Sequence, residues 1–320
     1  MKVVIYDDKG GLSISSDEIK SPAANEVLVK VIGSGINRAD LLQRKGLYPP
    51  PPGASDLLGL EVAGMIEKVG SQVNSLKVGD NVMGLLAGGG YAEYVTDDAG
   101  LFMRVPDAID LLQAAAIPEV FLTAYQVLFQ LAALKPNETV LIHAGASGLG
   151  SAAIQLAKTA GAKVIVTAGS ESKLAFCQKL GADLGINYKK EDFEVIIKEE
   201  GGVDVVLDVV GGGHFPKNLS VLNSEGRYLV VAFMAGNKAD LDLSAVLRKR
   251  ISIMGTTLRS RSLPYKQKLI QSFLFEFGES FANGSIIPVI DTVYTYQEVE
   301  KAHQYMASNQ NMGKLLLNWR

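Results

Sequence analysis

The chain has 320 residues, of which 48% are hydrophobic, and it carries a formal net charge of −3 with an isoelectric point of about 5.7. This length suggests two domains, and the apolar content is sufficient for two cores. The mildly acidic balance argues against nucleic acid or an anionic membrane surface as a partner. The single cysteine, Cys177, excludes an internal disulfide and a four-cysteine zinc lobe.

The chain begins directly with a strand pattern, MKVVIYDD, without a secretory segment before it. One uncharged window, 139–157, is long enough for a membrane helix, but it contains His143 and a glycine-rich turn. We therefore expect a soluble cytoplasmic protein with no membrane partner.

The first part of the chain, up to about residue 118, is rich in strand patterns. The predicted strands cover 2–6, 27–32, 61–69, 81–84 and 91–96, and turn residues separate them. Parallel strands need crossover helices, and few helices are evident here. We predict an irregular, partly closed antiparallel barrel.

From about residue 120, strands and helices alternate. The strands are predicted at 139–143, 163–167, 184–187, 203–209, 227–233 and 251–256, with helices at 148–160, 173–180, 193–200, 214–222 and 243–249. Gly161 and Gly181 each follow a helix, where a left-handed cap is expected. The pattern predicts an α/β fold with a doubly wound parallel sheet of six strands. Its last strand, 251–256, is an apolar edge that favours a homodimer through pairing with its symmetry mate.

The last part of the chain has helix patterns at 265–277 and 297–308 and short strands at 287–290 and 314–317. We expect it to fold back onto the N-terminal barrel. The predicted domains are therefore residues 1–119 with 264–320, and residues 120–263.

A glycine-rich turn follows the first strand of the alternating part. The sequence from Gly145 to Gly150 is GASGLG, with Ser147 where a strict dinucleotide fingerprint has glycine. Backbone N–H groups of Ser147, Gly148 and Leu149 would lie at the positive end of a helix, where a pyrophosphate binds. Gly150 would allow close packing of helix on strand. The context of six alternating strands favours dinucleotide binding over an ordinary strand–helix corner.

The tip of the next strand indicates which cofactor binds. An NAD site usually has an acid here, but the chain has Gly169, Ser170 and Lys173, with Tyr188 after the third strand. A hydroxyl and an ammonium suit a 2′-phosphate, so we favour NADPH over NADH. Ser170 would also cap the following helix. Glu171 supports the opposite choice of cofactor, because an acid facing the ribose would favour NADH.

Several short motifs stand in a specific order and spacing along the chain: GINRAD (35–40), GLYP (46–49), GLE (59–61), VGD (78–80), GYAEYV (90–95), LTA (122–124) and the glycine turn. Together they resemble those of medium-chain dehydrogenases/reductases, and within that superfamily those of the zinc-free, zeta-crystallin-like quinone oxidoreductases. The segments 49–56, HAGASGLG (143–150), NYKKEDF (187–193), LRSR (258–261) and GK (313–314) are most similar to the tumour-suppressor-inducible type. The resemblance spans nearly the whole chain. It implies a GroES-like barrel beside a Rossmann domain and, commonly, a homodimer.

The same resemblance implies that no zinc is bound. Zinc-dependent relatives carry cysteine where this chain has Ile36 or Asn37, and histidine at Leu60. Only Glu61 remains as a ligand, which is too few for a catalytic zinc. We therefore interpret Asp40 and Glu61 as structural or orienting residues.

The implied reaction is hydride transfer from C4 of NADPH to a quinone or an activated enone. The acceptor oxygen becomes negative, so donors must replace the metal. The resemblance indicates Asn37, Tyr48 and Thr123, with Tyr48 also able to deliver a proton. Each has a structural alternative: Asn37 as a cap, Tyr48 as an anchor beside the proline loop, and Thr123, at the start of the inter-domain helix, bonding its own backbone.

Phe233, Met234 and Gly255 are predicted to line the nicotinamide side of the site, although the first two could equally be core. Lys314, in the GK pair, is assigned to the cofactor site by resemblance. His143, at a strand end, is interpreted as a hydrogen-bonded core residue. Two other functions stay open. An enoyl-thioester or alkenal/one reductase would use the same donors, and an NADPH-binding structural or regulatory protein would show little turnover.

Overall fold

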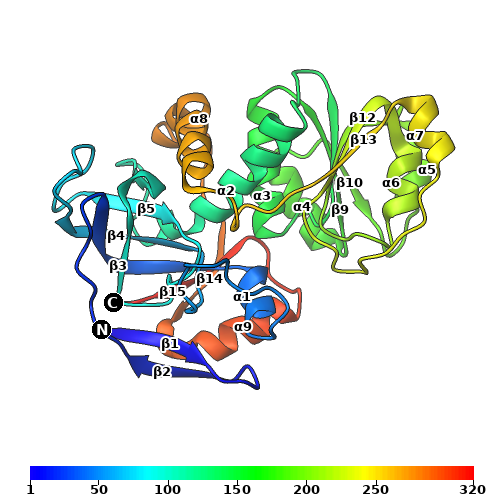
Figure 1. Ribbon diagram of the computed structural model, residues 1–320. Helices are drawn as coiled ribbons and strands as arrows, with labels where there is room; N and C mark the ends of the chain where they lie inside the picture. The colour runs from blue at the N-terminus through cyan, green and yellow to red at the C-terminus, as the bar shows by residue number, and fades with distance from the viewer. The chain divides into compact units, whose positions relative to one another are not determined.

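The computed structural model describes all 320 residues, and the chain divides into two compact units (Figure 1). Unit 1 contains Met1–Leu122 and Leu258–Arg320, and unit 2 contains Thr123–Thr257. The boundaries expected from the sequence, after residues 119 and 263, differ from these by three and six residues. One helical run, Gln113–Leu131, is long and apolar enough to cross a membrane, and 78% of its window is buried in the structure, as in a core helix.

Unit 2 is built on a parallel sheet of six strands. The strands are β8 (Thr139–Ile142), β9 (Lys163–Ala168), β10 (Leu184–Asn187), β11 (Val203–Asp208), β12 (Leu222–Val230) and β13 (Ser252–Gly255). The helices between them are α3 (Gly148–Thr159), α4 (Glu171–Lys179), α5 (Phe193–Glu199), α6 (Phe215–Val221) and α7 (Leu243–Lys249). The spatial order is β10-β9-β8-β11-β12-β13. This confirms the doubly wound fold, whose strand order reverses beside β8, where such sheets bind ligands.

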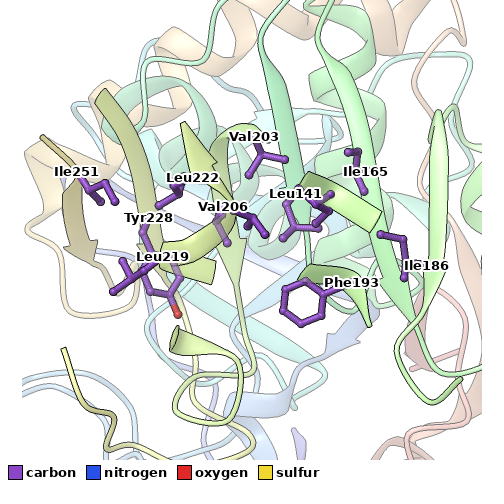
Figure 2. Packing of buried hydrophobic residues seen from close by; sticks show 12 residues of the cluster. Leu141, Ile165, Ile186, Phe193, Val203, Val206, Leu219, Leu222, Tyr228 and Ile251 are labelled. Atoms are coloured by element: carbon purple, nitrogen blue, oxygen red, sulfur yellow. The ribbon is translucent and has the colours of Figure 1, made fainter. Parts of the chain in front are cut away.

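The core of unit 2 explains why these strands read as apolar runs. Figure 2 shows Leu141, Ile165 and Val206 on neighbouring strands with Phe193 of α5 beside them, and all four are buried. Strands covered by helices on both faces need apolar residues at nearly every position. Gly161 and Gly181 have φ of 80° and 107°, which confirms the left-handed caps that end α3 and α4.

Unit 1 is a mostly antiparallel sheet. Its order is β14 (Ile290–Thr295), β15 (Lys314–Asn318), β3 (Glu26–Ile36), β4 (Glu61–Val69), β5 (Asn81–Leu85) and β7 (Phe102–Arg104), and β6 (Tyr94–Asp98) also pairs with β3. A separate hairpin contains β1 (Lys2–Tyr6) and β2 (Leu12–Ser16). The helices are α1 (Arg38–Gln43), α8 (Leu263–Ala282) and α9 (Val299–Ala307). Helix α2 (Pro118–Tyr125) runs across the boundary at Leu122.

The C-terminal strand confirms that the end of the chain folds back onto the N-terminal barrel. β15 pairs with β3 in antiparallel register, with Leu315 opposite Ile36. This register brings Lys314 next to Asn37, at the end of β3 where α1 begins.

Some predicted boundaries are wrong. The strand expected at 287–290 starts only at Ile290, because Pro288 has no N–H to donate to a sheet. The strand expected at 227–233 ends at Val230, so Phe233 and Met234 lie in the following loop. Helix α2 begins at Pro118, which places Thr123 in its second turn and not at its start.

Candidate active site

The glycine turn has the geometry of an anion site. Ser147 is the N-cap of α3, and its Oγ accepts a hydrogen bond from the Gly150 N–H at 3.0 Å. A Cβ atom on Gly150 would lie 2.4 Å from the carbonyl oxygen of Gly145, so only glycine fits there. Helix geometry gives the N–H groups of Gly148 and Leu149 no acceptor within α3. These groups, at the start of a 12-residue helix, fit a pyrophosphate.

The tip of β9 gathers the residues expected around a ribose phosphate. Ser170 caps α4, and its Oγ accepts from the Lys173 N–H at 3.3 Å. A Cβ atom on Gly169 would lie 3.0 Å from the Tyr188 hydroxyl and 3.1 Å from Cε of Lys189. Two hydroxyls and a lysine side chain therefore converge where the strand ends.

Glu171, the residue that argues for NADH, is already engaged by other groups. Its Oε1 accepts from the Asn187 amide at 2.8 Å and pairs with the Lys190 ammonium at 3.0 Å. These contacts lower the pKa of Glu171, with the Asn187 hydrogen bond as the largest cause. The carboxylate is thus held toward β10.

The remaining cofactor residues predicted in unit 2 are accessible. Phe233 and Met234 are 60% and 52% exposed, so the alternative that they are ordinary core is wrong. Gly255 lies in the exposed edge strand β13, and Thr123 is partly exposed on α2. Their ligand contacts remain predictions.

His143 is a core residue, as interpreted from the sequence. Its Nδ1 lies 2.8 Å from Oγ1 of Thr167, and its Nε2 lies 2.7 Å from Oδ1 of Asn218. Burial lowers the pKa of His143 to about 4. The ring is therefore neutral at pH 7, with both nitrogens in hydrogen bonds.

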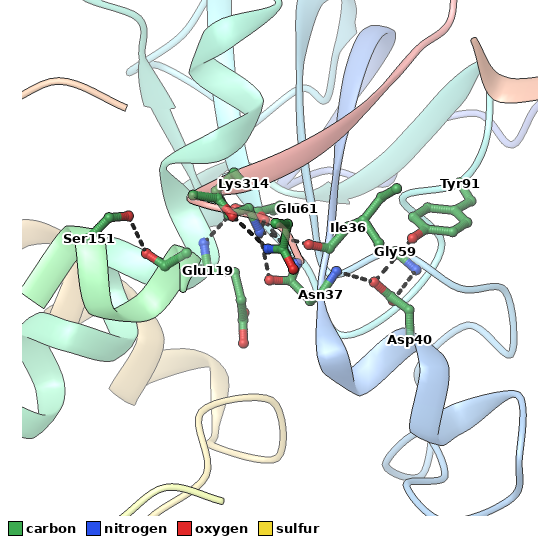
Figure 3. A network of polar contacts seen from close by, with 12 residues as sticks. Ile36, Asn37, Asp40, Gly59, Glu61, Tyr91, Glu119, Ser151 and Lys314 are labelled. Atoms are coloured by element: carbon green, nitrogen blue, oxygen red, sulfur yellow. Dashed lines mark hydrogen bonds and ion pairs between the residues drawn. The ribbon is translucent and has the colours of Figure 1, made fainter. Parts of the chain in front are cut away.

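Unit 1 contains a buried ion pair that holds the Asn37 amide (Figure 3). The Lys314 ammonium donates to Oε1 of Glu61 at 2.5 Å, to Oδ1 of Asn37 at 2.7 Å and to the Ile36 carbonyl at 3.0 Å. Asn37 donates one N–H of its amide to the same Glu61 oxygen at 2.9 Å. All three ammonium hydrogens thus have acceptors in unit 1, and one amide N–H of Asn37 is left for another acceptor.

Asp40 fixes the backbone of the same residue. Asn37 is the N-cap of α1, and its N–H donates to Oδ2 of Asp40 at 2.7 Å. The other Asp40 oxygen accepts from the Gly59 N–H at 3.0 Å, and the Tyr91 hydroxyl donates to Oδ2 at 3.2 Å. Burial raises the pKa of Asp40 to about 6. Asp40 and Glu61 are therefore orienting residues, as interpreted from the sequence.

The residues present do not form a zinc site. No group of three or more His, Cys, Asp or Glu side chains is placed to hold a metal ion. By the resemblance, zinc-dependent relatives carry a ligand at Ile36 or Asn37 and another at Leu60; here the Lys314 ammonium lies against Glu61. A second cation beside that carboxylate would meet a fixed positive charge.

Tyr48 is held by a buried arginine. Arg259 is 3% exposed and donates to the carbonyl oxygens of Tyr48 and Ala87, at 3.2 and 2.7 Å, and to Oε1 of Gln43 at 2.7 Å. Its guanidinium carbon also lies 5.4 Å from the centre of the Tyr48 ring. Burial raises the pKa of Tyr48 above its usual value, so the hydroxyl remains a donor at neutral pH.

The sequence does not indicate Arg259 or Glu119 as contributors to this site, nor the contacts that Lys314 makes here. Lys314 was assigned to the cofactor, whereas its ammonium contacts Asn37 and Glu61, and its place in the cofactor site remains a prediction. Arg259 lies in the LRSR motif, from which no contact with Tyr48 is predicted. Glu119 was passed over, although it is the only charged residue in the run AAAIPEVFLTAY at 114–125.

Comparison with known proteins places the chain in a family. Residues 23–107 match the alcohol dehydrogenase GroES-like domain, and residues 148–274 match the zinc-binding dehydrogenase family. Quinone oxidoreductase-like protein 2 of Bos taurus is 34% identical over 301 residues, which are 92% of this chain and 85% of that protein.

Solved structures agree over the full length. Escherichia coli quinone oxidoreductase, complexed with NADPH, superposes with a TM-score of 0.87 at 30% identity and 99% coverage of both chains. The CurK enoyl reductase superposes with a TM-score of 0.88 at 31% identity, covering 99% of this chain and 98% of the other. The chain therefore belongs to the medium-chain dehydrogenase/reductase superfamily and is a nicotinamide-dependent oxidoreductase related to the quinone oxidoreductases.

Proposed function

We propose that this protein transfers a hydride from NADPH to a quinone or an activated enone without zinc. The observation that carries the proposal is the Asn37 amide, held by Lys314 and Glu61 with one N–H left to donate. By the resemblance, zinc-dependent relatives carry a metal ligand at Ile36 or Asn37, so this arrangement would take the place of the metal.

The preference for NADPH rests on the tip of β9. Ser170, Tyr188 and Lys189 lie together there, and Glu171 is engaged by Asn187 and Lys190. A 2′-phosphate accepts hydrogen bonds and attracts cations, so this group of side chains suits it better than a bare ribose hydroxyl. The relative from Escherichia coli that is complexed with NADPH supports the same choice. A bound reduced nicotinamide would supply the hydride.

The role of unit 1 is to stabilise negative charge on the acceptor oxygen. The free N–H of Asn37 and the hydroxyl of Tyr48 are neutral donors. Lys314 and Glu61 hold the Asn37 amide, and Arg259 contacts the backbone carbonyl and the ring of Tyr48. Donors that are already oriented cost no reorganisation when charge develops on the acceptor. Arg259 fixes the backbone of Tyr48 through its carbonyl oxygen, whereas Lys314 contacts the side chain of Asn37 directly.

An enoyl-thioester or alkenal/one reductase is the second candidate, and the similarity to the CurK enoyl reductase favours it. The donors would be the same, because an enone and an enoyl thioester both develop an enolate oxygen. The acceptor is therefore tested with a panel of quinones, enones and acyl thioesters, by following the oxidation of NADPH.

Asn37→Ala tests the proposal at the residue that carries it. Loss of one oriented donor typically lowers kcat by about 10²–10³-fold, and we expect a fall of that order with NADPH affinity retained. Asn74→Ala is the matched control, since its amide bonds only to the Gln72 carbonyl on the surface of the same unit. Binding of NADPH without turnover of any acceptor would favour the structural or regulatory alternative. Stoichiometric zinc in the active protein would refute the metal-free mechanism.

A further inference from the structure

Helix α2 presents two residues on one face. Glu119 and Thr123 are four positions apart, so their side chains lie one above the other. Both are partly exposed, whereas the other residues of the helix are buried: Pro118, Val120, Phe121, Leu122, Ala124 and Tyr125. Thr123 is one of the donors that the resemblance indicates, and Glu119 lies on the same side of the helix.

The backbone of Glu119 is hydrogen-bonded to Glu61, which together with Lys314 holds Asn37 (Figure 3). The Glu119 N–H donates to Oε2 of Glu61 at 2.8 Å, and the other Glu61 oxygen accepts from Asn37 and Lys314. The side-chain Oε2 of Glu119 is shut off from solvent and has no hydrogen-bond partner. Buried polar atoms are nearly always paired, so an unpaired carboxyl oxygen beside a candidate active site calls for a functional explanation.

The surroundings of Glu119 decide its protonation. The charged and titratable groups that act on it or respond to its charge are Glu61, Asp40, Lys314, Lys266, Tyr48 and Arg259. The Lys314 ammonium is already paired with Glu61, and the Lys266 ammonium donates to the Arg259 carbonyl at 2.8 Å. Burial, followed by repulsion from Glu61, raises the pKa of Glu119 to about 8. The carboxyl is therefore a neutral acid at pH 7.

We propose that Glu119, as the carboxylic acid, delivers the proton that joins the acceptor after hydride transfer. The inference rests on the proposed function. A quinone that receives the hydride becomes a hydroquinone monoanion. The O–H bond of Glu119 then breaks, a new O–H bond forms on the acceptor oxygen, and Glu119 is left as a carboxylate that regains a proton from solvent. With an enone as substrate, hydride transfer gives an enolate, and the enolate takes the proton from Glu119 in the same way.

This assignment changes the role of Tyr48. A general acid is most effective when its pKa lies near the working pH, and the pKa of Tyr48 is raised above its usual value. Tyr48 thus donates a hydrogen bond to the oxyanion and keeps its proton.

Glu119→Gln is the test, because a carboxamide has the shape and the zero charge of the protonated acid but releases no proton. A purely structural role would survive the substitution. We expect kcat to fall by about 10²–10⁴-fold, with KM and NADPH affinity unchanged. The wild-type kcat should decline as the pH rises through about 8, and this decline should be absent from the variant. Glu18→Gln, an exposed glutamate of the same unit, is the control.

Infrared difference spectra of wild type against Glu119→Gln give a readout independent of turnover. A protonated carboxyl band at pH 7 that disappears at higher pH supports the inference, and an ionised Glu119 at pH 7 overturns it. If wild type and Glu119→Gln turn over equally, the inference fails while the proposed function stands. If the wild type oxidises NADPH with none of the quinones, enones and acyl thioesters in the panel, the proposed function fails and the inference fails with it.

Discussion

Replacing Lys314 by methionine removes the positive charge of the buried pair with little change in side-chain length. Lys314 and Glu61 are 3% and 0% exposed, so the variant leaves a carboxylate buried without its counter-ion. Breaking a buried pair in this way costs about 3–5 kcal/mol. Glu61 keeps two N–H donors, from Asn37 and from the backbone of Glu119, so we expect the lower end of that range, about 3 kcal/mol.

The single tryptophan allows this cost to be measured in unit 1 alone. Trp319 is 7% exposed, stacks on Tyr296 with ring centres 4.8 Å apart, and donates its indole N–H to Oγ of Ser34 at 2.8 Å. Its fluorescence during urea denaturation therefore reports the unfolding of this unit, which matters because two units need not unfold in one transition.

Two further variants separate charge burial from other effects. Lys301→Met removes an exposed lysine that pairs with Glu298, and it should change the free energy of unfolding by less than about 1 kcal/mol. Adding Glu61→Gln to Lys314→Met removes the uncompensated charge, so the double variant should be more stable than Lys314→Met alone. A loss below about 1 kcal/mol for Lys314→Met, or a further loss in the double variant, would refute the reasoning.

Two other predictions concern unit 2. Lys173→Ala should weaken NADPH binding and leave NADH binding unchanged in calorimetry, because NADPH carries the 2′-phosphate that would attract the ammonium and NADH does not. Equal NADPH affinity in wild type and variant would count against the assignment. We also propose a homodimer through β13, which has β12 as its only neighbour in the sheet and carries Ile253 at 37% exposure. Ile253→Asp should shift sedimentation from dimer to monomer, and a monomeric wild type would remove this proposal.

The sequence predicts unit 2 well for a physical reason. Each buried strand is an apolar run that ends in a turn, and the helices between them have their own caps, such as Ser147 and Ser170. These signals are local. The edge strand of the sheet in unit 1 is harder to predict. The apolar run before Ile290 resembles a strand, although Pro288 has no N–H for pairing there.

In the candidate site, too, local features are predictable from the sequence and long-range contacts are not. The glycine turn lies within one short segment, so spacing alone predicts it. The group around Asn37 comes from distant parts of the chain: Glu61 lies 24 residues further along, and Lys314 lies 253 residues from Glu61. Nothing in the sequence near Asn37 indicates an ammonium beside it, since the contact depends on the register of β15 against β3.

The charge balance of this group favours a particular kind of acceptor. In the proposed reaction, the charges of Lys314 and Glu61 cancel each other, and the acceptor oxygen would accept hydrogen bonds from neutral donors, the Asn37 amide and the Tyr48 hydroxyl. Charge-assisted hydrogen bonds are roughly twice as strong as neutral ones, and a zinc ion acts on the oxygen directly as a Lewis acid. With the weaker stabilisation, the proposed reaction would need an acceptor that spreads negative charge itself. Quinones and conjugated enones do so through their π-systems, whereas an isolated ketone does not.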